Sequence, residues 1–399
     1  MSACKSAETP APAQPQEAAQ SAAQPVEEPA GQPSTAAETT EEPEAEQAPQ
    51  VDLTKLPEDA VTIYTQGSTK FSMKDILPIL SDSSGYSQKW EFYIYTRPYE
   101  VRVKFEISNF AFSKNEGKIR GYVRRYDDKD EQIENYSLSK NLKNGQWKAR
   151  KDTLALEFDD YSLSWQNGMF HLKGSYDKGT FEYDIPANPW KPGTGVVYFG
   201  NNPSNVFKYS ILTYHQQVAK GTVVADGTPV EVKGQAYANH YATNIAVYDM
   251  FDEVADFRKR TENLLVEFRY YEPSAKYNAQ PFGFFFVAFE GQPVFSSTSI
   301  ERTPLETWLD EENYGYEISS RQRIVAHDGS NSATFEMLTA EPEAKDVYAD
   351  LPAFQRNVAS RFAKPIEYSI PIDWELLLNV DGYQAKIPMS ASYSITRLR

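Results

Sequence analysis

Short runs in which apolar and polar residues alternate recur along the chain from Tyr64 to the C-terminus. In the run Val101–Ser108, apolar residues at positions 101, 103, 105 and 107 alternate with Arg, Lys, Glu and Ser. A period of two is typical of a strand with one buried face. Turn sequences such as Asn144-Gly145 and Asn167-Gly168 separate the runs. The pattern predicts an all-β chain of antiparallel meanders, which either close into barrels or pack as sandwiches.

The chain has 399 residues, which suits two domains that each bury a core. The stretch 190–241, which we call the seam, interrupts the strand pattern with Gly, Pro and Asn, and a similar pattern begins again after it. We therefore expect a tail over 1–50, a first β-domain over 51–205 and a second over 206–399.

The tail, 5–50, consists almost entirely of Ala, Pro, Gln, Glu, Ser and Thr and has no aromatic residue. Such a segment buries too little apolar surface to offset its chain entropy, so we expect it to be disordered. It follows Met1-Ser2-Ala3-Cys4, which resembles the processing site of a bacterial lipoprotein, although the basic and apolar signal regions are missing. Either Cys4 is acylated and anchors a periplasmic protein to a membrane, or it is an incidental cysteine on a cytoplasmic arm.

The net charge of −16 argues against a nucleic-acid partner, because phosphate binding needs clustered Lys and Arg. The sequence contains no phosphate-binding loop, nucleophile motif or paired-cysteine metal site, so we expect no catalytic residue, cofactor or metal, and a monomer. Carboxylates are plentiful, but none is expected alone in an apolar strand, where burial would raise its pKa for acid catalysis.

One polar group stands out beside the seam, formed by Tyr237, Asn239, His240 and Asn244. Strand geometry places Tyr237 and Asn239 on one face and Ala238 and His240 on the other. The group is either the polar anchor of a ligand cavity or a satisfied core network. His215 lies in the same seam and is a further ligand-binding candidate; His215 and His240 together are either two metal ligands or structural histidines.

The run 282–289 is nearly all apolar, with Phe282, Phe284 and Phe286 on one face. Such a strand is buried on both sides or lines an apolar cavity, and core packing is the simpler reading. These three residues are included among the candidate ligand-binding residues. In 351–362, Phe354 and later apolar residues recur every four positions, which predicts a short amphipathic helix in the second domain.

Three segments resemble the fungal survival factor family: Trp-Lys-Pro-Gly-Thr-Gly-Val-Val-Tyr-Phe-Gly at 190–200, Gly-Thr-Val-Val at 221–224 with Val-Lys-Gly-Gln-Ala-Tyr-Ala-Asn-His at 232–240, and Asp-Val-Tyr-Ala-Asp-Leu-Pro-Ala-Phe at 346–354. The resemblance implies two tandem lipocalin-like barrels that carry a hydrophobic lipid such as ceramide between membranes. The family's membrane-binding segment has no counterpart here, and acylated Cys4 is a possible replacement.

The chain also resembles, more distantly, hydroxyneurosporene synthase and AttH-like proteins, which share the two-barrel plan. Near the equivalent of His240 that group carries an acidic residue suited to protonating an alkene, where this chain has Asn239. The expected function is therefore non-enzymatic lipid binding and transport. The alternatives are an isoprenoid hydratase and a barrel scaffold without a ligand.

Overall fold

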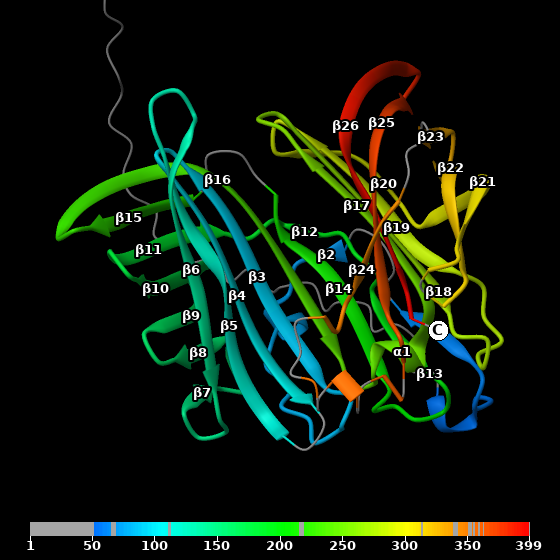
Figure 1. Ribbon diagram of the computed structural model, residues 1–399, viewed down its shortest axis with the longest axis horizontal. Coiled ribbons are helices and arrows are strands. Elements are labelled where there is room, and N and C mark those ends of the chain that lie inside the picture. Colours follow the sequence, from blue (N-terminus) through cyan, green and yellow to red (C-terminus); the bar gives the residue numbers. More distant parts are fainter. Residues whose placement is uncertain are drawn as a thin grey trace, which may run out of the picture. The chain divides into compact units, whose positions relative to one another are not determined.

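The computed structural model describes residues 52–64, 69–110, 113–214, 219–312, 314–337, 342–349, 353, 356–357, 360–361 and 363–398. Nearly all of this part is antiparallel β-structure, in two large sheets and one two-stranded ribbon (Figure 1). The short helices are η1 (Leu53–Lys55), η2 (Met73–Asp75) and α1 (Val247–Met250). No helix in these residues is long and apolar enough to cross a bilayer.

The first sheet is a meander that we call the first barrel. Its main path runs β6-β5-β4-β3-β16-β15-β11-β10-β9-β8-β7. The strands are β3 (Ser87–Thr96), β4 (Tyr99–Phe110), β5 (Ser113–Tyr126), β6 (Gln132–Leu142), β7 (Trp147–Ala149), β8 (Ala155–Phe158), β9 (Tyr161–Gln166), β10 (Met169–Tyr176), β11 (Gly179–Pro186), β15 (Ala219–Ala225) and β16 (Thr228–Thr243). Its last strand, β16, pairs with its first, β3.

A branch leaves the first barrel at β16. One edge of this strand pairs with β15 at its start and with β14 (Val206–Thr213) at its end. The branch continues through β13 (Val196–Phe199) to β1 (Val61–Tyr64). The separate ribbon pairs β2 (Thr69–Lys70) with β12 (Trp190–Lys191).

The second sheet, which we call the second barrel, repeats this plan in the order β20-β19-β18-β17-β26-β25-β23-β22-β21, with β24 beside β25. The strands are β17 (Phe251–Arg260), β18 (Leu264–Pro273), β19 (Phe282–Phe289), β20 (Gln292–Ser297), β21 (Ser299–Asp310), β22 (Tyr316–Asp328), β23 (Asn331–Met337), β24 (Glu343–Asp346), β25 (Ile366–Val380) and β26 (Tyr383–Arg397). The prediction of an all-β fold is confirmed, with two large antiparallel sheets in tandem, one of which forms a nearly closed barrel.

The change of barrel lies between Thr243 and Phe251, whereas the sequence placed the boundary at 205/206. The difference arises because β14, β15 and β16 pair back into the first sheet after the Gly- and Pro-rich stretch. The predicted lipidation site Cys4 and the key positions of the predicted helix, 354, 358 and 362, lie outside the described residues.

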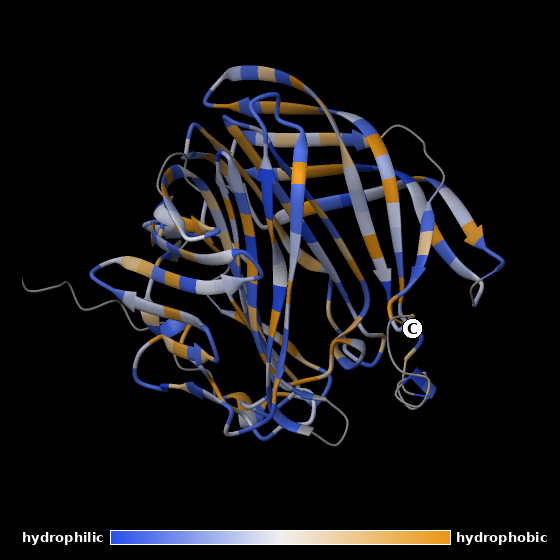
Figure 2. Cartoon of the chain, turned by 60° about the vertical axis from the view of Figure 1, so that its left-hand side comes forward, coloured by the Kyte–Doolittle hydropathy of each residue, from blue (hydrophilic) through white to orange (hydrophobic). Residues whose placement is uncertain are grey.

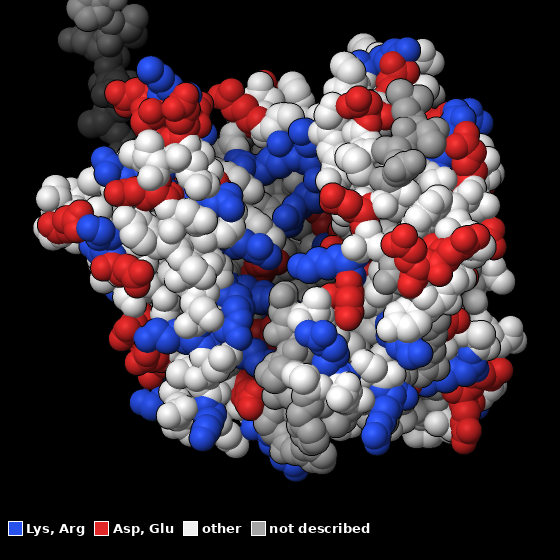
Figure 3. All heavy atoms as spheres, in the orientation of Figure 1, with Lys and Arg blue, Asp and Glu red and all other residues white. Residues whose placement is uncertain are grey.

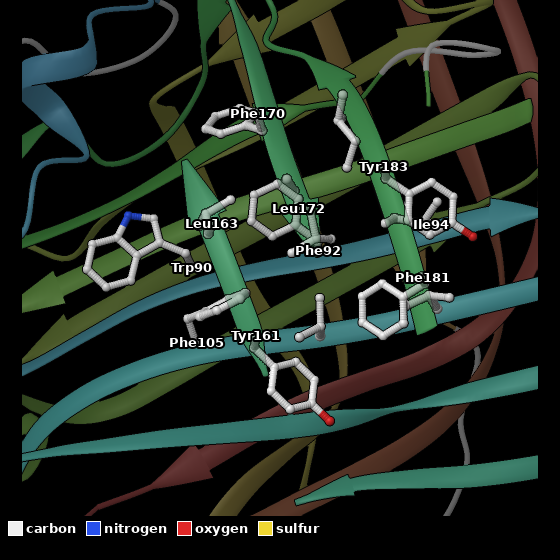
Figure 4. Close-up of a cluster of buried hydrophobic side chains, with 14 of the residues drawn as sticks. Trp90, Phe92, Ile94, Phe105, Tyr161, Leu163, Phe170, Leu172, Phe181 and Tyr183 are labelled. Carbon is white, nitrogen blue, oxygen red and sulfur yellow. The ribbon is translucent and has the colours of Figure 1, made fainter. Parts of the chain in front are cut away.

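Both barrel interiors are filled by their own side chains. Alternation of apolar and polar residues along the strands turns one face of each inward (Figure 2). In the first barrel Trp90, Phe92, Phe105 and Phe170 are fully buried and pack together (Figure 4). A separate apolar cluster of the second barrel centres on Phe268, Phe335, Trp374 and Tyr393.

Candidate functional site

The two faces of β16 have different surroundings, as its alternation predicts: one points into the first barrel and the other towards the second barrel. Ala238 belongs to the apolar core of the first barrel, and His240 contacts the Trp90 ring there, with ring centroids 5.4 Å apart. Tyr237 faces the other way and packs in a third apolar cluster between the two barrels. The seven candidate positions on β16 and β19 therefore divide between a barrel interior and the inter-barrel region.

His240 is buried at one end of the first barrel. The Gln88 amide nitrogen donates to the Leu77 carbonyl at 2.8 Å and lies 2.9 Å from His240 Nε2. The ring accepts this bond as neutral imidazole, because burial, with nearby Lys208 and Lys191, lowers its pKa well below the usual value. His240 Nδ1 has no partner among the described residues.

Both lysines near His240 contact the same residue, Asp75. Lys191 pairs with the Asp75 carboxylate, and the Lys208 ammonium donates to the Asp75 carbonyl. Burial lowers the pKa of Lys208 to about 8, with Lys191 adding to the effect and Asp75 opposing it. The polar groups around His240 thus lie inside the first barrel, away from Phe282, Phe284 and Phe286, which belong to the cluster between the barrels.

The predicted Phe282, Phe284 and Phe286 do lie together with Tyr237. All four belong to the cluster between the barrels, while Phe285, on the opposite face of β19, packs inside the second barrel. The prediction that this strand is buried on both sides is confirmed.

A carboxylate missed by the sequence analysis lies in the same cluster. Glu267 on β18 is fully buried and accepts hydrogen bonds from Tyr209 and Tyr237, each at 3.0 Å. Arg269 approaches Glu267 at 3.2 Å and covers the Tyr209 ring, 4.0 Å from its centroid. The sequence analysis did not single out this carboxylate, which is paired with Arg269 rather than alone. The run Leu264–Tyr271, in which Glu and Arg interrupt apolar residues, was the available signal.

Beside this network lies a cavity of about 190 Å³ between the barrels. We call the space between the facing strands β3, β16, β17 and β18 the inter-barrel cleft. The cavity is lined by Lys89, Glu91, Phe207, Tyr209, Asn239, Tyr241, Val247, Phe251, Val254, Arg269 and Tyr271. Lys and Arg side chains gather along the hollow between the two barrels (Figure 3).

Polar groups line one side of the cavity. Asn239 donates to Glu91 Oε2 at 3.3 Å, and Arg102 holds Glu91 Oε1 through two bonds at 2.7 and 3.0 Å. Burial opposes ionisation of Glu91, but Arg102 outweighs it and lowers the pKa of the carboxyl. The Tyr241 hydroxyl is buried and has no partner within the described structure. The cavity therefore presents an ionised acid, an amide and a free hydroxyl beside aromatic rings.

Two other predicted residues lie elsewhere. The Asn244 carbonyl accepts a hydrogen bond from Ser83, and its side-chain oxygen has no partner in the described part of the chain. His215 lies outside the described residues, so its relation to His240 is not defined. No three His, Cys, Asp or Glu side chains of the described residues are grouped so as to hold a metal.

No family model and no curated protein matches the sequence. Several solved structures, including the following three, are similar in fold. A candidate AttH from Nitrosomonas europaea is 12% identical with a TM-score of 0.45, covering 83% of this chain and 98% of its own. Kievitone hydratase from Nectria haematococca is 11% identical with a TM-score of 0.42, covering 86% and 97%. CghA in complex with Sch210972 is 8% identical with a TM-score of 0.38, covering 85% and 98%.

Proposed function

We propose that this protein binds a hydrophobic lipid in the inter-barrel cleft and carries it between membranes without chemical change. The observation that carries the proposal is the cavity between the barrels, which places aromatic side chains beside a polar edge. Both barrel interiors are occupied by their own side chains. A ligand is therefore better accommodated between the barrels than within one of them.

The walls of the cavity suit a lipid chain. Phe207, Phe251 and Tyr271 form one continuous aromatic surface, with ring centroids 5.0 to 5.1 Å apart. Covering apolar surface contributes roughly 25 cal/mol per Å². A volume of about 190 Å³ is smaller than typical ligand pockets of roughly 300–1,000 Å³. A long chain fills the cavity only in part, and its remainder lies along the open cleft.

The polar groups on one side of the cavity are better suited to contact a lipid headgroup than to perform acid catalysis. Hydration of an alkene needs a protonated acid, but Arg102 keeps Glu91 ionised and the neighbouring Asn239 is an amide. These groups favour lipid transport over hydration, and a ceramide-like lipid is the first ligand to test. Acylation of Cys4 in the periplasm and a monomeric state are further parts of the same proposal.

The test is native mass spectrometry of the full chain after incubation with a total lipid extract. Val254→Trp fills the cavity wall and is expected to abolish lipid retention. Val294→Trp, at an exposed position on β20, is the matched control and is expected to retain lipid. Thermal unfolding establishes that both variants fold.

Three outcomes contradict the proposal in different ways. If the wild-type protein retains no lipid from several extracts, the result favours the alternative of a barrel scaffold without a ligand. Equal retention by Val254→Trp and wild type places the ligand outside the cleft. Conversion of an isoprenoid substrate to its hydrate favours the enzyme.

A further inference from the structure

Two arginines project from β17 into the inter-barrel cleft without an acidic partner. Arg258 covers the rings of Tyr93 and Tyr237, at 4.4 and 4.6 Å from their centroids. Arg260, two residues further along the same face, lies 3.5 Å from the centroid of Tyr95. Within the described residues neither arginine forms an ion pair. Every aromatic partner belongs to the first barrel, so both cations lie at the junction.

The nearby acidic groups are already engaged. Glu91 holds Arg102, which itself lies 4.9 Å from the Tyr93 ring centroid. Glu100 accepts hydrogen bonds from two tyrosine hydroxyls of β5, at 2.7 and 2.6 Å. Glu267, which helps to raise the pKa of Arg258, already binds Tyr209, Tyr237 and Arg269. In the described part of the chain, the two arginines of β17 therefore have no carboxylate that forms an ion pair with them alone.

The surrounding tyrosines do not neutralise this charge. Burial raises the pKa of Tyr93 and of Tyr237, so both phenols stay protonated near neutral pH. Burial lowers the pKa of Arg260, whereas burial of Arg258 is outweighed by Tyr237 and Glu267, which raise its pKa. Cation–π contacts contribute about 0.5–2 kcal/mol each and leave the guanidinium charge in place.

The charge lies beside a small pocket at the end of the cleft. Arg260 lines this pocket together with Gln235, Tyr237 and Leu265. Arg258 lies four positions along β17 from Val254, which lines the larger cavity. At about 3.3 Å per residue, the two sites are roughly 13 Å apart along the strand. An amphiphile of ordinary length reaches from one to the other.

We propose that Arg258 and Arg260 bind the phosphate group of a phosphorylated lipid whose chain lies in the inter-barrel cavity. Guanidinium groups bind phosphate oxygens through paired N–H donors, which makes arginine well suited to the role. The inference rests on the proposed lipid-binding function and specifies the headgroup as anionic. A site of this kind would bind a phosphorylated lipid in preference to a neutral ceramide with the same chains.

The experiment compares ceramide with ceramide 1-phosphate of the same acyl chain. Each lipid is presented to the full-length protein in phosphatidylcholine vesicles, and the lipid extracted by the protein is measured. We expect wild type to prefer the phosphorylated lipid by roughly tenfold, since hydrogen bonds to charged groups contribute about 1.5–3 kcal/mol. The double variant R258Q/R260Q is expected to lose this preference and to keep ceramide binding.

The matched control is R321Q/R323Q. These arginines also lie two residues apart on a strand of the second barrel, but both pair with Glu336. The control is expected to keep the preference. The single variant R260Q guards against misfolding of the double variant, and it is expected to reduce the preference at least threefold. Equal extraction of both lipids by wild type, or equal loss of both in R258Q/R260Q, overturns the proposal.

Free phosphate separates failure of this site from failure of the lipid function. If neither lipid is extracted, the thermal midpoint is measured in phosphate and in chloride at equal ionic strength. If phosphate raises the midpoint of wild type but not that of R258Q/R260Q, the anion site is supported and only the lipid-binding part of the proposal is contradicted. An identical midpoint in both salts overturns the site.

Discussion

The interior of the first barrel and the inter-barrel cleft are both rich in aromatic rings, yet they are built differently. Inside the barrel, rings such as Phe92 and Phe170 pack against each other within an apolar cluster, and polar groups gather near His240. In the cleft, Tyr209 and Tyr237 bind Glu267, and arginines cover their rings. The comparison teaches that one strand, β16, contributes a packing face to the barrel and a polar face to the cleft.

The largest expected effect tests the barrel interior. Trp90 is fully buried and its indole N–H donates to the Ile76 carbonyl at 2.9 Å. Trp90→Ala is expected to lower the free energy of unfolding by about 4 kcal/mol, because it leaves a cavity and an unpaired carbonyl. Chemical denaturation measures the loss. Lipid selectivity of the remaining folded protein should not change, and a changed headgroup preference would show that the two regions are not separate.

The next effect tests the cleft. Glu267→Ala removes the acceptor for Tyr209 and Tyr237 and leaves Arg269 without its nearest carboxylate. The expected loss of stability is about 3 kcal/mol, since breaking a buried ion pair exposes the remaining charge to an apolar environment. Unlike Trp90→Ala, Glu267→Ala should also alter the extraction of lipid by the protein. Stability equal to wild type would mean that the network does not hold the barrels together.

Acid should weaken the outer face of the first barrel in a defined pH window. Burial opposes ionisation of Glu106, but Lys89, Lys104 and Lys118 outweigh it and lower its pKa to about 2 from 4.5. A depressed carboxyl pKa stabilises the fold above pH 4.5, and this contribution is lost as the pH falls towards 2. Glu106→Gln should lower stability at neutral pH by about 3 kcal/mol, with no difference from wild type near pH 2. A difference that is independent of pH would contradict this.

The smallest effect concerns His240. Because its ring stays neutral in the folded state, only the unfolded state takes up a proton as the pH falls below 6.5. Stability should therefore decrease on acidification, with a slope of at most about 1.4 kcal/mol per pH unit from this residue. His240→Gln should flatten that part of the profile, as measured by urea unfolding between neutral and mildly acidic pH. An unchanged slope would assign the acid sensitivity to other groups.

The sequence predicted the faces of strands well, because a period of two depends only on local geometry. It separated Tyr237 and Asn239 from Ala238 and His240, and it marked 282–289 as buried on both sides. Pairing between distant strands leaves no such local trace. The return of β14, β15 and β16 to the first sheet, which moves the change of barrel to 243–251, therefore escaped prediction.

The chemistry of the cleft escaped for the same reason. Glu267 and Arg269 are two residues of one strand, but their partners Tyr209 and Tyr237 lie on β14 and β16 of the other barrel. Arg258 and Arg260 stand in the sequence Phe-Arg-Lys-Arg at 257–260, where nothing local distinguishes them from solvated charges. Only the docking of one barrel on the other makes them neighbours of the tyrosines.

Each main meander ends at strands that follow one another in the chain, β6 with β7 and β20 with β21. The turn after β6 contains Asn144 and Gly145, the latter with a φ of 90°. A guest domain inserted at this turn would interrupt none of the strand pairs, because β6 and β7 are not paired with each other. The turn between β6 and β7 is thus a natural position for an inserted domain that leaves the paired strands of the first barrel intact.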